Sequence, residues 1–304
     1  MNPSRRSFLK TGAIAATAAA IMPKSIFAAP AQIQRVGLQL YSVRDAMMID
    51  PAATLKKLAD MGYQHVEHAN YVNRKFYGWT AKEFKKRLDD LGLQMPSGHT
   101  VMTSAHWDAT TNDFTDVWKL TVEDAATMGQ KFVISPWMDD KVRHDTDLLK
   151  STMDQFNKSG ELCQKYNMKF GYHNHDFEFT TMVGDIRLFD YIMQNTDPEK
   201  VSQQLDIGNM YGRENNAMGI IEKYPGRFIS MHVKDEIKSA DKNEGTGYES
   251  TILGKGVLPV KEVLKTAKKV GGTVYLIIEQ ESYQGLDPMD CVKIDLQTMK
   301  KWGY

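Results

Sequence analysis

The sequence of 304 residues has little cysteine and no surplus of charge of either sign. Its 38 basic and 38 acidic side chains argue against nucleic acid or an anionic membrane as a partner, because such partners bind basic surfaces. The two cysteines, Cys163 and Cys291, have no CxxC spacing and no disulfide framework, so we expect two small buried side chains. The apolar run from Thr11 to Ile21 is too short to span a membrane, and no stable membrane anchor is expected.

The first thirty residues have the pattern of a targeting segment. Two adjacent arginines, Arg5 and Arg6, precede the apolar run as in a twin-arginine signal, and small residues suitable for cleavage follow at Ala28–Ala31. We therefore predict a twin-arginine signal peptide over residues 1–30, a mature domain over residues 31–304 and a periplasmic location. The alternative is a chance arginine pair in a cytoplasmic protein. Twin-arginine export carries folded proteins, which suits a protein loaded with a metal ion before export.

Short apolar runs alternate with amphipathic stretches along the mature chain. Eight runs are predicted to be strands: Val36–Tyr41, His65–His68, Leu93–His99, Lys131–Ser135, Met168–His175, Val201–Asp206, Phe228–Lys234 and Thr273–Glu279. A helix is predicted after each strand: Pro51–Met61, Thr80–Leu91, Asp113–Met128, Asp147–Tyr166, Asp185–Asn195, Ala217–Tyr224, Val260–Val270 and Pro288–Lys300. This alternation favours a parallel sheet, and eight units in about 270 residues predict a single (β/α)8 TIM barrel.

A doubly wound open sheet is the competing fold. It would be favoured by a glycine fingerprint after the first strand, and the residues from Gly37 to Leu40 do not supply one. The glycines between Gly245 and Gly256 lack the GxxxxGK[ST] spacing of a phosphate loop, so we interpret the segment Asp235–Leu258 as a flexible cover for the site. No change of composition divides the mature chain, which predicts one domain.

Side chains with metal-binding and proton-transfer chemistry end strands five to eight. The four ends carry His173, Asp206, His232 and Glu279, and the active site of a TIM barrel lies at the carboxyl ends of its strands. His175 lies two residues after His173 and is expected on the same strand face. One such side chain is more often structural, but four at one level predict a metal site. The mixed donor set suits one divalent ion such as Mn²⁺, Co²⁺, Zn²⁺ or Fe²⁺ and suits Ca²⁺ poorly.

The predicted catalytic residues are His175, His173 and Lys234. With His173 on the metal, His175 is free to act as a general base or acid, and Lys234 is placed to bind a substrate oxygen or stabilise negative charge. Substrate contacts are predicted for polar side chains near other strand ends and for loop tryptophans, whose flat faces suit sugar rings: Gln39, Tyr41, Glu67, His99, Trp107 and Trp137. The alternative for the tryptophans is loop packing or a subunit contact, and the sequence leaves a homo-oligomer open.

Five stretches resemble one known family: Gly37–Arg44, Gly171–His175, Leu205–Asn209, His232–Asp235 and Ile278–Gln280. Across the mature chain they are similar to the xylose isomerase-like TIM barrels, often labelled sugar phosphate isomerase/epimerase. The resemblance implies a divalent metal ion held by strands five to eight, with Asp206, His232 and Glu279 as ligands. Keto-sugar epimerases of this family have a glutamate at the position of His173, where it is both a ligand and a proton-transfer group. Because this chain has histidine in place of that glutamate, the expected base is His175 or His173 itself.

The resemblance also implies the reaction class, which is proton abstraction from a carbon next to a sugar carbonyl with a metal ion stabilising the enediolate. Return of the proton gives an isomerase or epimerase, and loss of a β substituent gives a lyase or dehydratase. Because sugar phosphates are cytoplasmic, we favour a lyase that eliminates the aglycone of a 3-keto-glycoside during glycan breakdown. The alternatives are an isomerase or epimerase of an unphosphorylated sugar and, in another class, a non-catalytic sugar-binding protein. In each case the expected partner is a small sugar or keto-glycoside.

Overall fold

Eight parallel strands close into a barrel within residues 34–240 and 246–304, the parts of the chain that the computed structural model describes. Barrel strands that follow one another along the chain are neighbours, and the first strand closes the ring against the last. The predicted single (β/α)8 barrel is therefore confirmed, whereas the predicted signal peptide lies outside the described residues. The barrel strands are β1 (Arg35–Gln39), β2 (His65–His68), β5 (Gln94–His99), β8 (Phe132–Ser135), β9 (Lys169–His173), β12 (Val201–Asp206), β13 (Phe228–Val233) and β16 (Tyr275–Ile278).

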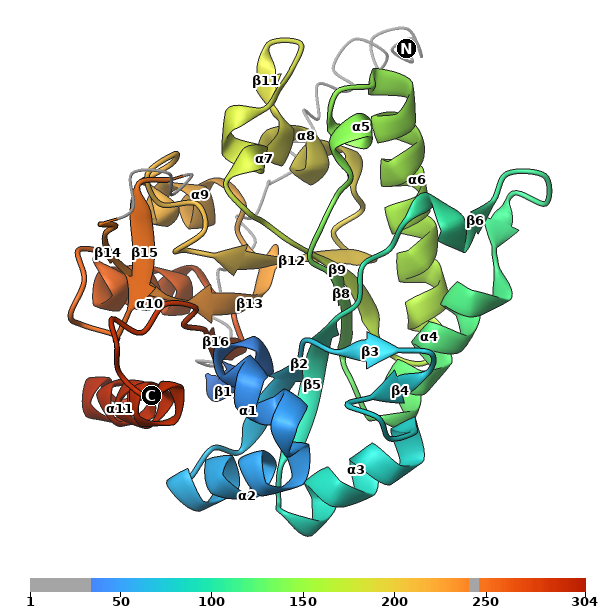
Figure 1. Cartoon of the computed structure of the whole chain (residues 1–304). Helices are drawn as coiled ribbons and strands as arrows, with labels where there is room; N and C mark the ends of the chain where they lie inside the picture. Colours follow the sequence, from blue (N-terminus) through green and yellow to red (C-terminus); the bar gives the residue numbers. More distant parts are fainter. Residues whose placement is uncertain (1–33, 241–245) are drawn as a thin grey trace, which may run out of the picture. The chain divides into compact units, whose positions relative to one another are not determined.

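Helices surround the ring of strands (Figure 1). Local signals set their ends: at α2 the Asp50 carboxylate accepts a backbone hydrogen bond (2.9 Å), Pro51 starts the first turn, and Gly62 ends the helix with a φ of 97°. None of the described helices is long and apolar enough to cross a lipid bilayer. The helices are α1 (Arg44–Ile49), α2 (Pro51–Met61), α3 (Ala81–Asp90), α4 (Asp116–Thr127), α5 (Asp140–Arg143), α6 (Thr146–Gln164), α7 (Phe177–Thr180), α8 (Leu188–Asn195), α9 (Ala217–Lys223), α10 (Val260–Val270) and α11 (Pro288–Trp302).

Two strands that lead to the site are shorter than the sequence predicted. Strand β1 ends at Gln39, because residues Leu40–Val43 form a 3-10 turn instead of continuing the strand through Tyr41. Strand β9 ends at His173, so His175 does not share a strand face with it, as the two-residue spacing had suggested. The position of His175 is therefore set by the turn that follows β9.

Hairpins extend the loops at the carboxyl end of the barrel. The segment interpreted as a flexible cover contains one of them, in which β14 (Asp235–Lys238) pairs antiparallel with β15 (Tyr248–Thr251). The Asp235 carboxylate, at the start of the same segment, accepts hydrogen bonds from the backbone of Gly254 (2.8 Å) and Gly256 (3.0 Å), so these two glycines are held against the start of β14. Other hairpins in the described chain are β3 (Tyr71–Val72) with β4 (Lys75–Phe76), β6 (Trp107–Asp108) with β7 (Asp113–Phe114), and β10 (Met182–Val183) with β11 (Ile186–Arg187).

Side chains inside the barrel form two layers of opposite character. Successive residues of a strand face opposite sides of the sheet, so each strand sends alternate side chains into the interior. The layer towards the amino ends of the strands is apolar and contains Phe132, Ile134, Tyr275 and Ile277. The next layer is polar and largely buried; it contains Gln39, Glu67, His99, His173, Gln204 and His232. This polar layer is the floor on which the site is built.

Candidate active site

Glu67 lies at the centre of the polar layer and is fully buried. Its carboxylate accepts hydrogen bonds from Gln39 Nε2 (2.8 Å), Gln204 Nε2 (2.8 Å), His232 Nε2 (2.6 Å) and the Ser97 hydroxyl. Burial alone would raise the pKa of this carboxyl, but two neighbouring imidazoles and these hydrogen bonds lower it to about 2. Glu67 and the equally buried Gln39 therefore orient their neighbours beneath the site. The substrate contacts predicted for these two residues stay predictions.

Gln204 links Glu67 to two histidines. Its amide nitrogen donates to the Glu67 carboxylate (2.8 Å) and to the Ser230 hydroxyl (3.1 Å), so its oxygen must face the imidazoles. That oxygen lies 2.7 Å from His99 Nε2 and 2.9 Å from His173 Nδ1. Both of these nitrogens must then carry a hydrogen. In neutral His173 the other ring nitrogen, Nε2, is left with a free lone pair.

Four side chains converge above this layer, and they are those predicted to bind a metal ion. His232 Nδ1 lies 2.9 Å from Glu279 Oε2 and 3.6 Å from Asp206 Oδ2, and His173 Nε2 lies 3.7 Å from the same Asp206 oxygen. The hydrogen bond from His232 Nε2 to Glu67 leaves Nδ1 to face this group, and a carboxylate behind a histidine is a common support for a metal ligand. The structure thus brings Asp206, His232 and Glu279 together and places His173 beside Asp206.

Asp206 has the surroundings expected of a metal ligand. Its Oδ1 accepts hydrogen bonds from the backbone of Gly208 and Asn209 (2.8 Å each), whereas its buried Oδ2 accepts none within the described residues and forms an ion pair with the Lys234 ammonium (3.1 Å). Asp206, His232 and Glu279 each offer one ligand atom, and these atoms lie within 4.8 Å of one another. Imidazole nitrogen combined with carboxylate oxygen suits a transition-metal dication. The donor set therefore fits a metal ion.

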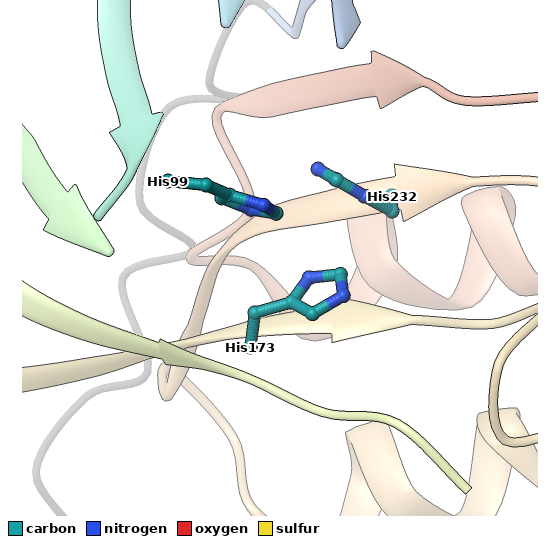
Figure 2. Close-up of side chains that lie close together, drawn as sticks. All are labelled: His99, His173 and His232. Carbon is teal, nitrogen blue, oxygen red and sulfur yellow. The ribbon is translucent and has the colours of Figure 1, made fainter. Parts of the chain in front are cut away.

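Three histidines, His99, His173 and His232, also lie close together (Figure 2). The ring centroids of His173 and His232 are 4.6 Å apart, and the rings of His99 and His232 are stacked with centroids 5.1 Å apart. However, one nitrogen of each ring is already engaged, with Gln204 for His99 and His173 and with Glu67 for His232. The set that includes carboxylates is therefore the better metal site.

A fully buried ammonium group lies among the same carboxylates. Lys234 Nζ is 2.8 Å from Glu279 Oε2, 3.1 Å from Asp206 Oδ2 and 3.3 Å from Glu281 Oε2, and it donates a hydrogen bond to Asn209 Oδ1 (2.9 Å). Burial lowers the pKa of an amine, but these carboxylates outweigh burial and raise the pKa of Lys234 well above its usual value. Lys234 is thus an internal cation on the two carboxylate oxygens that would bind a metal ion.

His175, the predicted base, lies in the turn after β9. Its backbone N–H donates to the buried Glu178 carboxylate (2.8 Å), which also accepts the Tyr172 hydroxyl hydrogen (2.5 Å). Its ring centroid is 5.2 Å from that of His173, and its buried Nδ1 has no hydrogen-bond partner among the residues described. Burial, with a smaller effect from Lys234, lowers the pKa of His175 to about 4. The ring is therefore neutral at pH 7 and can accept a proton.

A cavity of about 410 Å³ opens beside the ligand set. Three of the predicted substrate contacts, Tyr41, His99 and Trp137, form part of its wall. Trp107 does not: its ring packs edge-on against Phe114 within the β6–β7 hairpin, with centroids 5.0 Å apart. Trp107 therefore packs within its own hairpin, and its substrate contact stays a prediction.

Two side chains of the site, Gln204 and Asn209, were not among those predicted. The Asn209 amide nitrogen lies 3.3 Å from His173 Nε2. Strand alternation could have indicated Gln204, because it lies two residues before Asp206 on the same face of β12. Asn209 lies beyond the strand, where no periodicity marks it, although it belongs to one of the stretches that resemble the family.

A family model described as xylose isomerase-like TIM barrel matches residues 55–302. The chain belongs to this family. The match begins in α2 and ends at the last residue of α11, so it covers every strand of the barrel except β1. It therefore includes all four converging side chains and the turn that carries His175.

Relatives and solved structures within this fold differ in the activities their names state. An inosose dehydratase from Bacillus licheniformis is 31% identical over 135 residues, which cover 41% of this chain and 44% of that protein. The match thus spans less than half the length of that relative. A sugar phosphate isomerase/epimerase from Parabacteroides distasonis is 26% identical, covers 88% of this chain and 98% of its own, and has a TM-score of 0.73. The IOLI protein, solved with a bound zinc atom, is 12% identical with coverages of 88% and 98% and a TM-score of 0.69.

Proposed function

We propose that this protein is a divalent-metal-dependent carbohydrate enzyme that removes a proton from the carbon next to a sugar carbonyl. The observation that carries the proposal is the meeting of three potential ligand atoms, from Asp206, His232 and Glu279, with His173 3.7 Å from Asp206 and with a neutral imidazole, His175, in the wall of the adjoining cavity. Proton abstraction of this kind needs positive charge at the carbonyl oxygen and a base at the neighbouring C–H. One cavity supplies both groups.

The atoms that would hold the ion are His173 Nε2, Asp206 Oδ2, His232 Nδ1 and Glu279 Oε2. Their chemistry suits Mn²⁺, Co²⁺, Zn²⁺ or Fe²⁺, and the zinc atom in the IOLI protein of the same fold supports such a site. When bound, the ion would polarise the substrate carbonyl and stabilise negative charge on its oxygen. Gln204 and Glu67 serve this site by fixing which nitrogen of His173 and of His232 faces the ligand set.

The remaining side chains divide the proton chemistry between them. His173 is the alternative base, but its Nδ1 hydrogen is held by Gln204 and its Nε2 faces the ligand set, so His175 is the better base. Lys234 would hydrogen-bond a substrate oxygen and offset the charge that develops there. Tyr41 and Trp137 supply apolar walls against which a sugar ring can pack.

Within this class we favour a 3-keto-glycoside 1,2-lyase, which eliminates the aglycone during glycan breakdown. Epimerisation needs two proton-transfer groups on opposite faces of the substrate, and His173 replaces the glutamate that serves as one of them in keto-sugar epimerases. The likeness to an inosose dehydratase supports elimination, because a dehydratase also expels a group from the β carbon. An isomerase or epimerase of an unphosphorylated sugar is the alternative, and the Parabacteroides distasonis protein favours it. A non-catalytic sugar-binding protein is the alternative of another class.

We also propose that the protein is exported to the periplasm. The support is the sequence of residues 1–30, in which Arg5 and Arg6 precede an alanine-rich apolar run. Replacing both arginines with lysine should retain the full-length protein in the cytoplasm, as measured by cell fractionation. A periplasmic double variant would contradict the twin-arginine route.

The deciding experiment is incubation of the metal-loaded protein in D₂O with 3-keto-glucosides and with free ketoses. A lyase releases the aglycone and an unsaturated keto sugar. An isomerase or epimerase places deuterium in a new free sugar, and tight sugar binding without turnover indicates a binding protein. Elemental analysis should find about one transition-metal ion per chain. Full activity after removal of the metal would contradict the proposal.

A further inference from the structure

A second cavity, of about 350 Å³, opens beside the first. His175, Asn209 and Glu281 line both cavities, so the two spaces meet at the proposed base. The β14–β15 hairpin supplies part of the second wall through Glu236 and Tyr248. A substrate whose reacting carbon lies at His175 can therefore extend from the metal ligands into the space beneath the hairpin.

Glu236 is a carboxyl side chain of this second cavity that has no partner. The residue is 6% exposed, and no hydrogen bond or ion pair joins its carboxyl group to another residue of the described chain. Other carboxylates of the same wall are engaged: Glu281 pairs with Lys234 (3.3 Å), and Glu249 accepts the hydroxyl hydrogen of Ser282 (2.8 Å). A carboxyl group that lies in a cavity wall and has no protein partner within the described chain is available to a ligand in that cavity.

Gly208 allows the Glu236 carboxyl group to occupy this position. A Cβ atom at residue 208 would lie 2.4 Å from Glu236 Oε1 and 2.6 Å from Lys234 Cβ, so any larger residue would displace one of them. Gly208 follows Asp206 by two residues, in the turn that also carries Asn209. The free carboxyl group is therefore held next to the turn that presents a proposed metal ligand.

The environment of Glu236 keeps a proton on its carboxyl group. Burial raises its pKa to about 8; the Lys234 ammonium opposes this shift, and the carboxylates of Asp206, Glu281 and Asp235 add to it. A protonated carboxyl group in the wall of the cavity is suited to act as a general acid.

We propose that the second cavity binds the leaving half of the substrate and that Glu236 protonates the departing oxygen. This inference rests on the proposed lyase function. In the step, His175 takes the proton from C2, the electrons of the C2–H bond form the C1–C2 double bond, and the C1–O bond breaks with its electron pair going to oxygen. Glu236 gives this oxygen its proton, and the products are an alcohol and an unsaturated keto sugar. Solvent then returns a proton to Glu236 and takes one from His175.

The polar wall of the second cavity identifies the class of leaving group. Four residues that carry a hydroxyl group, Thr246, Tyr248, Ser250 and Ser282, are among those that line it. Such a wall suits an aglycone rich in hydroxyl groups, and a second sugar is such a group. The substrate class inferred from the two cavities is therefore a 3-keto-disaccharide, with the keto ring beside the metal ligands and the second ring beneath the hairpin.

The test varies how much the leaving group needs an acid. We compare wild type with Glu236→Gln on methyl 3-keto-glucoside, which has a poor leaving group, and on 4-nitrophenyl 3-keto-glucoside, whose leaving group departs without protonation. Loss of a general acid should lower kcat/KM on the order of a hundredfold for the methyl glycoside and by less than about threefold for the nitrophenyl glycoside. Glu236→Ala should regain activity on the methyl glycoside when formic acid is added. Because only a folded variant can be rescued in this way, the rescue separates loss of the acid from loss of the fold.

Glu249→Gln is the matched control, because it removes another carboxylate of the same wall. It should change the kcat/KM of both glycosides by the same factor. Equal losses on both glycosides for Glu236→Gln, or no loss on either, would overturn the role of Glu236 while leaving the lyase function intact. Failure of wild type to release aglycone from any 3-keto-glycoside would overturn the lyase function and this inference together. Better turnover of a 3-keto-disaccharide than of the methyl glycoside by wild type is expected, and the reverse order would contradict the second-ring subsite.

Discussion

The buried carboxyl groups near the barrel axis and those farther out hold their protons differently. The axial carboxyls, Glu67, Asp206 and Glu279, have pKa values below their usual range although they are buried. The peripheral carboxyls, Glu178, Glu236 and Asp295, have pKa values raised by burial to about 7, 8 and 7. Burial disfavours the charged form in both groups, so the difference comes from their neighbours.

Cationic partners account for the axial group. His232 lies within hydrogen-bond distance of Glu67 and Glu279, and Lys234 lies 2.8 Å and 3.1 Å from Glu279 and Asp206. The peripheral carboxyls lack an ion pair of this kind within the described residues. The comparison shows where the molecule provides anionic ligands and where it keeps protons. Substitutions that remove one of these charges or protons should therefore change metal binding or stability in different ways for the two groups.

The largest effect is expected from loss of an axial charge at the ligand set. Asp206→Asn keeps an oxygen for the backbone of Gly208 and Asn209 but removes the negative charge from the other atom. Metal content should fall from about one ion per chain to nearly none, with at least about a thousandfold loss of kcat/KM. Elemental analysis and steady-state kinetics measure both. The control is Asp295→Asn, a peripheral carboxyl outside the site, which should keep its metal; wild-type metal content in Asp206→Asn would contradict the assignment.

Glu67→Gln tests the axial carboxyl beneath the site. The amide has one acceptor oxygen in place of two and no negative charge, which leaves the charged His232 with Glu279 alone as an anionic partner at hydrogen-bond distance, so the free energy of unfolding should fall by about 3 kcal/mol. Metal affinity should weaken by about 10- to 100-fold, because the orientation of the His232 ring is no longer fixed. Urea denaturation and metal titration measure the two effects. Ser97→Ala, which removes a single donor to Glu67, should show a much smaller loss; an equal loss would show that the charge of Glu67 is unimportant.

The raised pKa of Asp295, one of the peripheral carboxyls, predicts how the stability of the protein changes with pH. Its raised pKa of about 7 means that the folded state keeps a proton that the unfolded state releases near pH 4. The free energy of unfolding of wild type should therefore fall as pH rises from about 4 through 7. Asparagine does not titrate, so the variant should lose less stability than wild type over the same pH range. The difference between the two losses should be on the order of 2 kcal/mol. Denaturation at pH 5 and pH 8 measures the difference, and parallel profiles of variant and wild type would contradict the raised pKa.

Lys234→Met removes the cation that keeps the axial carboxyls charged. In the metal-free protein Lys234 lies on the same oxygens that would bind the ion, so its loss should raise metal affinity about tenfold. Calorimetric titration of metal-free protein at one pH measures the change. Lys238→Met, on the exposed end of β14, is the control and should leave the affinity unchanged. Weaker metal binding by Lys234→Met would show that the ammonium supports the ion instead of competing with it.

Much of the fold and part of the site followed from local patterns. The alternation of short apolar runs with amphipathic stretches predicted the eight strands and their order, and the caps of α2 predicted its two ends. The coincidence of His173, Asp206, His232 and Glu279 at successive strand ends predicted that these side chains lie near one another, and their role as metal ligands stays a prediction. These signals act within a few residues, since strand alternation has a period of two and a helix cap spans one turn. Such signals are weaker beyond the ends of the strands. The fifth strand was predicted to run to His175, whereas β9 ends at His173 and His175 lies in the turn that follows.

The barrel, and the side chains that its strands carry to the site, thus follow from local sequence patterns. The charge, the hydrogen bonds and the exposure of those side chains depend on contacts between residues far apart in the sequence. Glu67 and His232 are 165 residues apart in the sequence, yet the contact between Glu67 and His232 Nε2 makes Nδ1 the nitrogen that faces the ligand set. In the same way, packing decided that Trp137 faces the cavity and Trp107 does not. Charge, tautomer and exposure depend on distances of a few ångströms between groups far apart along the chain, and local sequence patterns do not encode those distances.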